Sequence, residues 1–372
     1  MNRQHLLSRL GQRHSVLFSN GPWSIWDRQN PEFLSAPLWG CFEHIDGVDV
    51  DSAPRVLLTH PLKRLWDRAA TLLASMRLKR RISSSPGGAL IAYVFHPSYV
   101  KYALAARPDL LVYGPYDLFS ATPGWGVEDA TQESALLGAC DLVIAASDAI
   151  RGELASRTGS PVFCVPNGVD AEAFERGSQL PAPPDIASIP HPRIGYVGSL
   201  NRKVDFALIE ELARSNPPWQ FVLIGASFGH DDRSREAMRR CEGLSNVHFL
   251  GMKRPSELPA YMAALDVGVM CYLRGSWCEY GYPLKLHEYL AAGLPVVSVD
   301  LPAVEEFSDL ILMAKGASAW AASIREALEM NSEPCKSARR EVARQNSWDL
   351  RVDRIEGHLI DALRFKPLRT YK

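Results

Sequence analysis

Hydrophobic runs of strand length alternate with segments of helix length along most of this chain. In the first half, the runs that predict strands are 15–19, 55–60, 89–96, 110–114, 141–147 and 161–168. In the second half they are 193–200, 219–227, 246–251, 266–272, 295–300 and 310–315. Continuously apolar strands separated by helices are typical of parallel sheets covered on both faces. The pattern therefore predicts an α/β fold.

The alternation is interrupted by a proline-rich stretch at 178–192, "SQLPAPPDIASIPHP". Proline removes backbone donors and disfavours helix, so we expect a linker here between two Rossmann-like, doubly wound domains, 1–176 and 177–347. The length of 372 residues also favours two cores. The amphipathic segment "WDLRVDRIEGHLIDALRF" begins the tail 348–372 and is expected to form a closing helix that packs back on the first domain.

Composition excludes several classes of protein. The chain is 47% hydrophobic and 22% charged with a formal net charge of -1, so nothing global indicates a nucleic-acid partner. No apolar run is long enough to predict a membrane-spanning helix, and the first residues lack the features of a signal peptide. The seven cysteines are scattered, which favours mostly buried free thiols in a reducing cytoplasm. No cluster has metal-ligand spacing, and we expect no metal or other cofactor.

The stretch "YPLKLHEYLAAGLPVV" at 282–297 predicts a helix followed by a strand, with Lys285 in the first helical turn. A cation there opposes the helix dipole, and an anion is favoured. Glu288 lies three residues on and shares the face of Lys285. Ligands of parallel sheets bind beyond the carboxyl ends of the strands, so a diphosphate could pair with Lys285 while ribose hydroxyls donate to Glu288. The alternative is an ordinary surface pair between the two.

A second strand end, "GYVGSLNRKVD" at 195–205, also suits phosphate. Gly198 allows close backbone approach, and the cations Arg202 and Lys203 are expected at the start of a helix. A solvated turn is the alternative for either cation.

Together with these segments, "VPNGVD" at 165–170 and "LPAYMAALDVGVMCY" at 258–272 resemble GT-B glycosyltransferases of the bacterial exopolysaccharide and teichuronic-acid types. The resemblance runs from about residue 110 onward. It implies two Rossmann-like domains facing a cleft, with the nucleotide-sugar in the second. Tyr280 stands where the large retaining family has an acid, and Glu279 comes one place early. The pattern is closer to xanthan-type glucuronosyltransferases, which are inverting.

In that type, residues matching Met252, Tyr272, Lys285 and Glu288 line the nucleotide pocket. The candidate donor-binding residues are Gly198, Arg202, Lys203, Met252, Tyr272, Tyr282, Lys285 and Glu288.

Inverting transfer needs a base that takes the acceptor proton, and we expect it in the first domain. Asp117 follows a strand in "VYGPYDLFSATPG" and is the first candidate. Its segment resembles a family pattern Y-D-x-x-D-D in which Gly114 replaces the first acid. His96 ends another strand and is the alternative base or an acceptor-binding group. A turn acid and a structural histidine are the corresponding alternatives.

Two further features of the first domain each have a functional and a purely structural interpretation. The tryptophans Trp23 and Trp26, in a glycine loop after the first strand, could stack on acceptor sugars or simply pack. Asp49 and Asp51 form a D-x-D, which we expect to be a solvated loop before a strand and not a metal site.

The segment "LKRLWDRAATLLASMRLKRRI" at 62–82 predicts an amphipathic helix with seven cations and one acid. Trp66 and six other apolar residues form one face, while Arg77, Lys79 and Arg80 belong to the basic set. Such a helix can lie on an anionic membrane surface, where a lipid-linked acceptor would be found. Alternatively, it covers the first sheet with its polar side solvated.

We therefore expect a metal-independent glycosyltransferase of the hexosyltransferase type. It moves a sugar from a nucleotide-sugar, expected to be a UDP-sugar, to a saccharide or lipid-linked saccharide during bacterial polysaccharide synthesis. We expect it in the cytoplasm, peripherally on the inner face of the membrane. Two alternatives stay open: a nucleotide-sugar 2-epimerase of the same fold, and an inactive carbohydrate-binding scaffold subunit.

Overall fold

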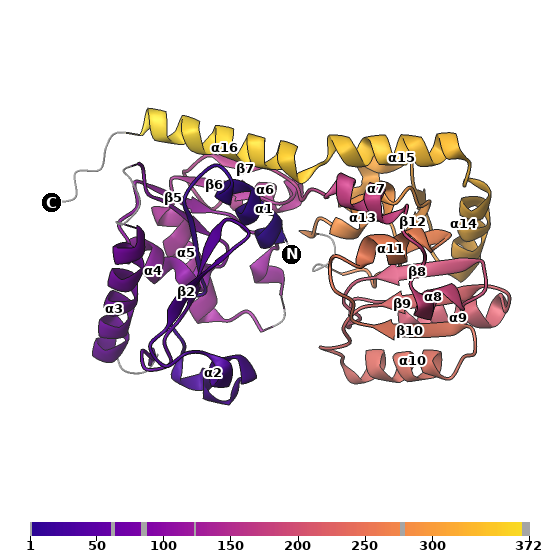
Figure 1. Cartoon of the computed structure of the whole chain (residues 1–372), viewed down its shortest axis with the longest axis horizontal. Coiled ribbons are helices and arrows are strands. Elements are labelled where there is room, and N and C mark those ends of the chain that lie inside the picture. The colour runs from indigo at the N-terminus through magenta and orange to yellow at the C-terminus, as the bar shows by residue number, and fades with distance from the viewer. Residues whose placement is uncertain (1, 61–63, 83–87, 123, 276–279, 367–372) are drawn as a thin grey trace. The chain divides into compact units, whose positions relative to one another are not determined.

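The computed structural model describes residues 2–60, 64–82, 88–122, 124–275 and 280–366. The chain forms two compact units, Met1–Pro166 with Arg351–Lys372, and Asn167–Leu350 (Figure 1). The boundary lies between Pro166 and Asn167, ten residues before the expected position between 176 and 177. Each unit is described separately.

The first unit begins with a helix and a small mixed sheet and continues as a parallel α/β layer. Its elements are α1 (Asn2–Gly11), β1 (Val16–Ser19), η1 (Ile25–Gln29), α2 (Pro31–Ser35), β2 (Cys41–Ile45), β3 (Val48–Ser52), α3 (Arg64–Ile82), β4 (Ile91–Val94), η2 (Pro97–Tyr99), α4 (Val100–Ala105), β5 (Leu110–Tyr113), η3 (Phe119–Ala121), α5 (Val127–Ala139), β6 (Leu142–Ala145), α6 (Asp148–Ala155) and β7 (Val162–Cys164).

The strands of this unit form two sheets. One is parallel with the order β4-β5-β6-β7, and the other has the order β1-β3-β2 with an antiparallel β2–β3 hairpin. The hairpin was not predicted, although its turn carries a strong sequence signal. Asp46 and Gly47 have φ values of 49° and 81°, the backbone that an Asp-Gly hairpin turn requires. In this unit the predicted parallel sheet is therefore accompanied by a small mixed sheet that was not predicted.

The predicted strand at 55–60 is also wrong. Pro54 precedes it, and the amide of Leu57 donates to the Pro54 carbonyl in a turn. Only Thr59 makes an isolated bridge, with Ser24. An apolar run alone cannot form a strand where proline and a turn divert its backbone donors.

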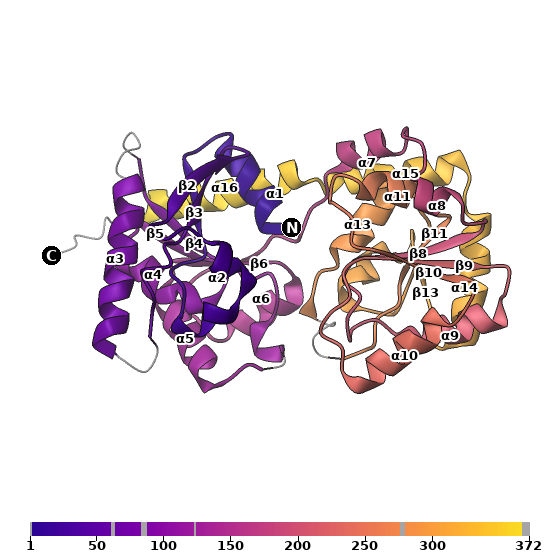
Figure 2. The ribbon, with the colours of Figure 1, turned by 60° about the horizontal axis from the view of Figure 1, so that its bottom comes forward.

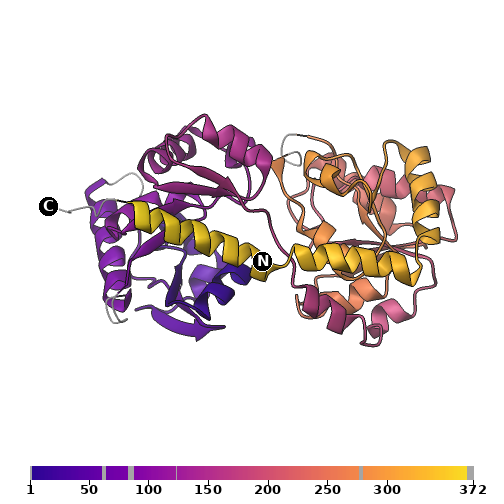
Figure 3. The same cartoon turned by 90° about the horizontal axis from the view of Figure 1, so that it is seen from above.

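The closing helix α16 (Trp348–Phe365) packs on the first unit from Arg351 onward (Figure 3). Its residues Val352, Ile355 and Leu359 are buried in one cluster with the β5 residues Leu110 and Val112. Leu6 and Leu10 of α1 join the same cluster. The first and last helices of the chain thus share in covering the parallel sheet.

The second unit is a regular doubly wound layer. Its elements are α7 (Ala171–Gly177), α8 (Pro184–Ala187), β8 (Arg193–Val197), α9 (Phe206–Ser215), β9 (Gln220–Ile224), α10 (Asp232–Glu242), β10 (Val247–Gly251), α11 (Leu258–Ala263), β11 (Val267–Met270), α13 (Leu284–Ala291), β12 (Val296–Ser298), η4 (Pro302–Phe307), β13 (Leu312–Met313), α14 (Ala317–Glu329) and α15 (Glu333–Gln345).

Its six strands are parallel in the order β10-β9-β8-β11-β12-β13, with helices on both faces (Figure 2). The chain winds outward from β8 in one direction and from β11 in the other. The carboxyl ends of β8 and β11 therefore form the topological switch point, where open α/β sheets bind ligands.

The proline-rich stretch does not link the units. It lies wholly in the second unit, where Ile186 and Ile189 are buried in the core. The buried Arg193 donates to the carbonyls of Ile189 and Ala187 and so satisfies backbone that proline leaves outside regular structure. Proline content here indicated irregular backbone correctly, but the isoleucines hold that backbone against the sheet.

Candidate functional site

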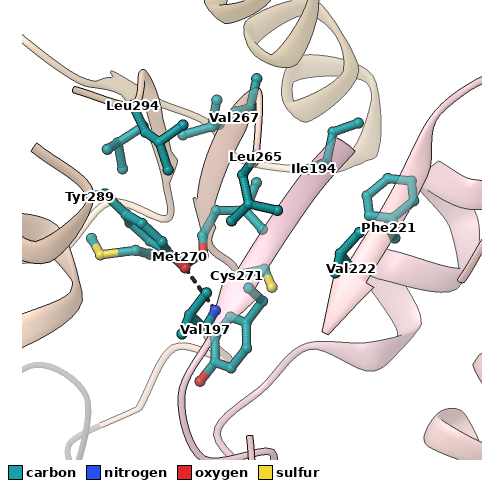
Figure 4. Close-up of a cluster of buried hydrophobic side chains, with 14 of the residues drawn as sticks. Ile194, Val197, Phe221, Val222, Leu265, Val267, Met270, Cys271, Tyr289 and Leu294 are labelled. Carbon is teal, nitrogen blue, oxygen red and sulfur yellow. Dashed lines mark hydrogen bonds between the residues drawn. The ribbon is translucent and has the colours of Figure 1, made fainter. Parts of the chain in front are cut away.

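The switch point of the second unit is closed on one side by α13. Its residues Leu286, Tyr289 and Leu290 are fully buried against the sheet. The Tyr289 hydroxyl accepts a hydrogen bond from the Val197 amide at 2.9 Å, as the dashed line in Figure 4 shows. It also lies 3.2 Å from the Gly195 carbonyl, to which it can donate. One side chain thus ties α13 to the end of β8.

The other end of α13 is held by a buried cation. Arg339 of α15 donates to the Gly293 carbonyl, directly after the helix, at 3.1 Å. It also donates to the Met330 carbonyl at 2.8 Å. A cation at the C-terminal end matches the helix dipole, so α13 is fixed at both ends.

Lys285 lies at the start of α13 with its ammonium over two aromatic rings. Its Nζ is 4.9 Å from the ring centre of Tyr196 and 5.4 Å from that of Tyr272. Tyr196 comes from β8 and Tyr272 follows β11, so the lysine spans the switch point. These distances are within cation–π range. Pro283 is the N-cap of the helix, which begins at Leu284, so Lys285 lies in the first turn.

Gly198, directly after β8, has to be glycine. Its φ is +142°, and a Cβ there would overlap the Cε and Nζ atoms of Lys285. Gly225, at the end of β9, faces the same restriction because its Cβ would overlap the Gly198 carbonyl. The structure therefore brings together the candidates Gly198, Tyr272 and Lys285, and it adds Tyr196, which sequence reasoning missed.

Glu288 is half-buried one turn after Lys285. Burial raises the pKa of its carboxyl above the ordinary value, and the nearby Lys285 ammonium partly opposes this shift. Within the described part of the chain, neither the Glu288 carboxylate nor the Lys285 ammonium makes an ion pair with another side chain. A cation and a hydrogen-bond acceptor thus lie on one helical face beside a glycine turn, an arrangement that suits a phosphate and a hydroxyl group.

The loop between β8 and α9 carries the other two predicted cations. Arg202 and Lys203 lie in the turn before α9, which begins at Phe206, and not in its first helical turn. The Lys203 carbonyl accepts from the Leu273 amide at 2.7 Å, and Val204 bridges Tyr272. The loop is therefore fastened to the end of β11, next to Lys285.

Tyr282 and Met252 are placed differently from the other candidates. Tyr282 is buried, its hydroxyl lies 2.7 Å from Nε2 of His287, and its carbonyl accepts from the Asn167 side chain at 3.1 Å. These contacts give it a role in holding the segment before α13.

Met252 follows β10, two strands from β8 at the sheet edge, and is 75% exposed. No described contact joins it to Lys285.

In the first unit, Asp117 lies four residues after β5 and is half-buried. One of its carboxylate oxygens accepts from the Leu118 amide at 3.0 Å. The structure explains the nearby Gly114, since a Cβ there would overlap the ring of Tyr93. An acid cannot occupy position 114 while Tyr93 fills that space.

His96 caps η2 and packs against Phe119, with ring centres 4.6 Å apart. Burial lowers its pKa, although the Asp129 and Glu133 carboxylates act in the opposite direction. The Ser98 amide donates to Nδ1 at 3.3 Å, so the proton of the neutral ring is on Nε2. A ring in this state presents a donor at Nε2, which favours ligand binding over proton abstraction.

The tryptophans differ from each other. Trp23 is half-buried, donates to the Ala53 carbonyl at 3.0 Å and packs edge-on against Phe33, which indicates a packing role. Trp26 is 68% exposed.

The D-x-D lies on strand β3 and not in a loop before one, so that expectation is wrong. Asp51 pairs with Arg77 and accepts from the Ser19 hydroxyl at 2.7 Å. Asp49 pairs with Arg81 at 2.5 Å and with His44 at 2.9 Å. Partners on α3 and on the neighbouring strand β2 explain why this hairpin carries two acids.

The described part of α3 presents its apolar face outward. Leu65, Trp66, Leu72, Leu73 and Met76 are 44–83% exposed, whereas the buried face consists of the small residues Ala70, Thr71, Ala74 and Ser75. The alternative that the apolar face covers the sheet is therefore wrong.

The chain is similar to known glycosyltransferases in sequence and in fold. A model of the family described as glycosyl transferases group 1 matches residues 191–330. That match lies wholly within the second unit. The match includes β8, β11 and α13, and therefore the whole arrangement around Lys285.

A relative is the putative teichuronic acid biosynthesis glycosyltransferase of Bacillus subtilis (strain 168), 30% identical over 225 residues. That match covers 58% of this chain and 56% of the relative, so the chain spans about half the length of the curated relative.

Solved structures confirm the predicted GT-B fold. Sucrose-phosphate synthase from Thermosynechococcus elongatus has a TM-score of 0.69 at 17% identity, covering 97% of this chain and 92% of that one. Anabaena HepE in complex with UDP-glucose has a TM-score of 0.63 at 18% identity, covering 85% and 87%.

The described residues show no membrane-spanning helix, no metal-binding cluster and no disulfide. No helix among them is long and apolar enough to cross a membrane. They contain no group of three or more His, Cys, Asp or Glu side chains that could hold a metal ion. Their six cysteines are free, three of them buried, and the seventh, Cys278, lies outside the described residues, as does Glu279.

Proposed function

We propose that this protein transfers a sugar from a UDP-sugar to a saccharide or lipid-linked saccharide in bacterial polysaccharide synthesis. The second unit binds the donor, with the diphosphate beside Lys285, Gly198 and the Arg202–Lys203 turn. Glu288 accepts hydrogen bonds from the ribose. The match to the group 1 family supports this proposal, as do the similar proteins, one a putative teichuronic acid glycosyltransferase and one solved in complex with UDP-glucose.

The observation that carries the proposal is the placement of Lys285. The strained backbone of Gly198 disfavours any side chain there, and the Lys285 ammonium lies over two tyrosine rings beside this glycine turn at the switch point. An ammonium held in this way, without a carboxylate partner in the described chain, matches the leaving diphosphate of glycosyl transfer.

Calorimetric titration with UDP and then GDP tests the donor site. Lys285→Ala is expected to weaken UDP binding roughly 10- to 100-fold, because a charge-assisted hydrogen bond contributes about 1.5–3 kcal/mol. Lys315→Ala is the control, since Lys315 is an exposed lysine at the end of β13, three strands away in the same sheet. Absence of binding to either nucleotide would overturn the proposal and favour a scaffold role.

For the chemistry, we assign Asp117 as the base that takes the acceptor proton, with inversion at the transferred carbon. His96 then serves as a hydrogen-bond donor to a substrate, because its Nε2 carries the proton. Asp117→Asn is expected to leave UDP affinity unchanged and to abolish transfer of labelled sugar to a lipid or saccharide acceptor. Equal loss of UDP affinity in this variant and in Lys285→Ala would contradict the division of roles. The anomeric configuration of the product, read by NMR, decides between inversion and retention.

Metal independence and a hexosyl donor are parts of the same proposal. Transfer measured with excess chelator is expected to proceed at the rate seen with added Mg²⁺, because the cations of the second unit neutralise the diphosphate. Loss of transfer on chelation, restored by Mg²⁺, would refute this part alone.

Release of a free sugar nucleotide or its hydrolysis product without acceptor would instead indicate an epimerase.

We place the protein peripherally on the cytoplasmic face of the membrane, because α3 exposes a large apolar face beside basic side chains. Helices of this kind bind interfaces through buried apolar area and attraction to anionic lipids. Sedimentation of the full chain with vesicles tests this part, and no sedimentation would contradict it.

A further inference from the structure

The strongest feature outside the donor site is a groove of about 490 Å³ between α3 and the β2–β3 hairpin. Its lining residues are Phe42, Leu73, Met76, Arg77, Arg80 and Arg81. The volume is in the range of small-molecule sites, about 300–1,000 Å³. Three guanidinium groups and three apolar side chains in one groove call for a ligand that is both anionic and apolar.

Two of the guanidinium groups are fixed by the fold. Arg77 pairs with Asp51, donates to the Cys41 carbonyl at 3.2 Å and lies 4.3 Å above the Phe42 ring. Arg81 pairs with Asp49 and lies 5.9 Å from the same ring. Phe42 and the D-x-D of β3 thus hold one wall of the groove.

Arg80 is different. It is exposed and has no carboxylate partner among the described residues, so the groove holds three cations against two acids. It follows Met76 by four residues and Leu73 by seven, and therefore lies on the same face of α3 as these exposed apolar side chains. An anion bound by Arg80 would have an apolar path beginning directly beside it.

We propose that this groove binds the phosphate headgroup of an anionic membrane lipid, with the lipid's hydrocarbon chain lying along Leu73, Met76 and the exposed face of α3. Charge complementarity argues for the headgroup, since Arg80 presents a planar fork that fits two phosphate oxygens. The exposed leucines argue for a lipid over a soluble phosphate, because a free anion leaves their surface in water. This inference extends the membrane part of the proposed function by naming the partner and its site.

The test compares Arg80→Lys with Arg68→Lys in the full chain. Both residues are exposed on α3, but Arg68 does not line the groove. Both variants keep the charge, and only the first removes the bidentate fork from the groove. Binding to phosphatidylcholine vesicles with and without phosphatidylglycerol is measured by sedimentation. We expect Arg80→Lys to weaken binding to the anionic vesicles about tenfold and Arg68→Lys to leave it unchanged.

The apolar part is tested with Leu73→Gln, against Val127→Gln, which removes an exposed hydrophobic residue of α5. We expect about fivefold to tenfold weaker vesicle binding for Leu73→Gln only. Met76→Gln, with the same expectation, replaces it if Leu73→Gln does not fold by circular dichroism.

Vesicle binding that is equal in wild type, Arg80→Lys and Arg68→Lys would overturn the headgroup site and leave general electrostatic attraction. Equal binding to vesicles with and without phosphatidylglycerol, or no binding, would also overturn it. These assays need no donor, so their failure with intact UDP affinity would leave the glycosyltransferase proposal standing. Loss of UDP affinity with intact vesicle binding would overturn the glycosyltransferase proposal and leave the headgroup site standing.

Discussion

The helices α3 and α13 both place basic side chains beside large apolar ones, but they use their apolar faces in opposite ways. In α13, Leu286, Tyr289 and Leu290 are fully buried, and the lysine lies where helix and sheet meet. In α3, Leu72 and Leu73 are more than half exposed, and the buried contacts are made by Ala70, Ala74 and their small polar neighbours. One helix is fixed by its apolar face, and the other presents that face to its surroundings.

The difference teaches that an amphipathic pattern does not state which face packs inward. The hydrogen bonds of α13 explain its orientation, because the Tyr289 hydroxyl bonds to the backbone of β8 and the Arg339 guanidinium of α15 donates to the Gly293 carbonyl after the helix. In α3, Thr71 and Ser75 bond to carbonyls of the same helix, at 2.7 and 2.8 Å, which lets small polar residues be buried on that face.

The largest expected effect contrasts the two faces directly. Leu290→Ala should lower the free energy of unfolding by about 2–5 kcal/mol, because it leaves a cavity under α13. Leu72→Ala should change it by about 0.5 kcal/mol or less, because that side chain is exposed. Urea denaturation of both variants measures the difference. A large loss for Leu72→Ala would break the comparison by showing that the α3 face is packed in solution.

A second prediction concerns the glycine beneath Lys285. Gly198→Ala places a Cβ where Lys285 lies and in a backbone region that costs about 1–3 kcal/mol for other residues. We expect at least about tenfold weaker UDP binding by calorimetry, with a loss of stability. Gly243→Ala is the control, since its φ is -79° and its Cβ would meet nothing within 3.4 Å. Unchanged UDP affinity in Gly198→Ala would separate Lys285 from the donor site.

The smallest expected effect concerns the ionisation of Glu288. Its folded pKa is raised by burial above the ordinary value of 4.5, so ionisation disfavours the folded state. Below about pH 4.5, the Glu288→Gln variant should therefore melt at the same temperature as the wild type. At neutral pH it should melt about 2–4 °C higher than the wild type. The gain appears as pH rises through the interval between the unfolded and folded pKa values.

The same variant is expected to bind UDP more weakly, because an amide is a poorer acceptor for ribose hydroxyls than a carboxylate. Glu211→Gln, at an exposed position of α9, should show neither effect. A melting difference for Glu288→Gln that does not depend on pH would argue against ionisation as its cause.

Much of the proposed donor site was predictable, because it follows from strand ends in a regular sheet. The order of the apolar runs predicts β8 and β11, and the rule of the switch point directs attention to Gly198 and Tyr272. Tyr196 could not be found in this way, since nothing in a buried strand pattern tells which tyrosine lies beneath a lysine almost ninety residues later. The contact of Tyr282 with the buried His287 could not be found for a related reason, since only folding brings these two side chains together.

The amino-acid sequence by itself determined the α/β class, the second sheet and the segments that end its strands, because periodicity and glycine spacing act over short stretches of chain. Tertiary structure alone decided how the β2–β3 hairpin pairs with α3, where the proline-rich stretch packs, and which face of α3 is exposed. These depend on contacts such as Arg77 with Asp51 and Ile186 with the core, between residues distant in sequence. A local pattern shows only that a residue is apolar or charged. Which residue it contacts depends on how the whole chain folds.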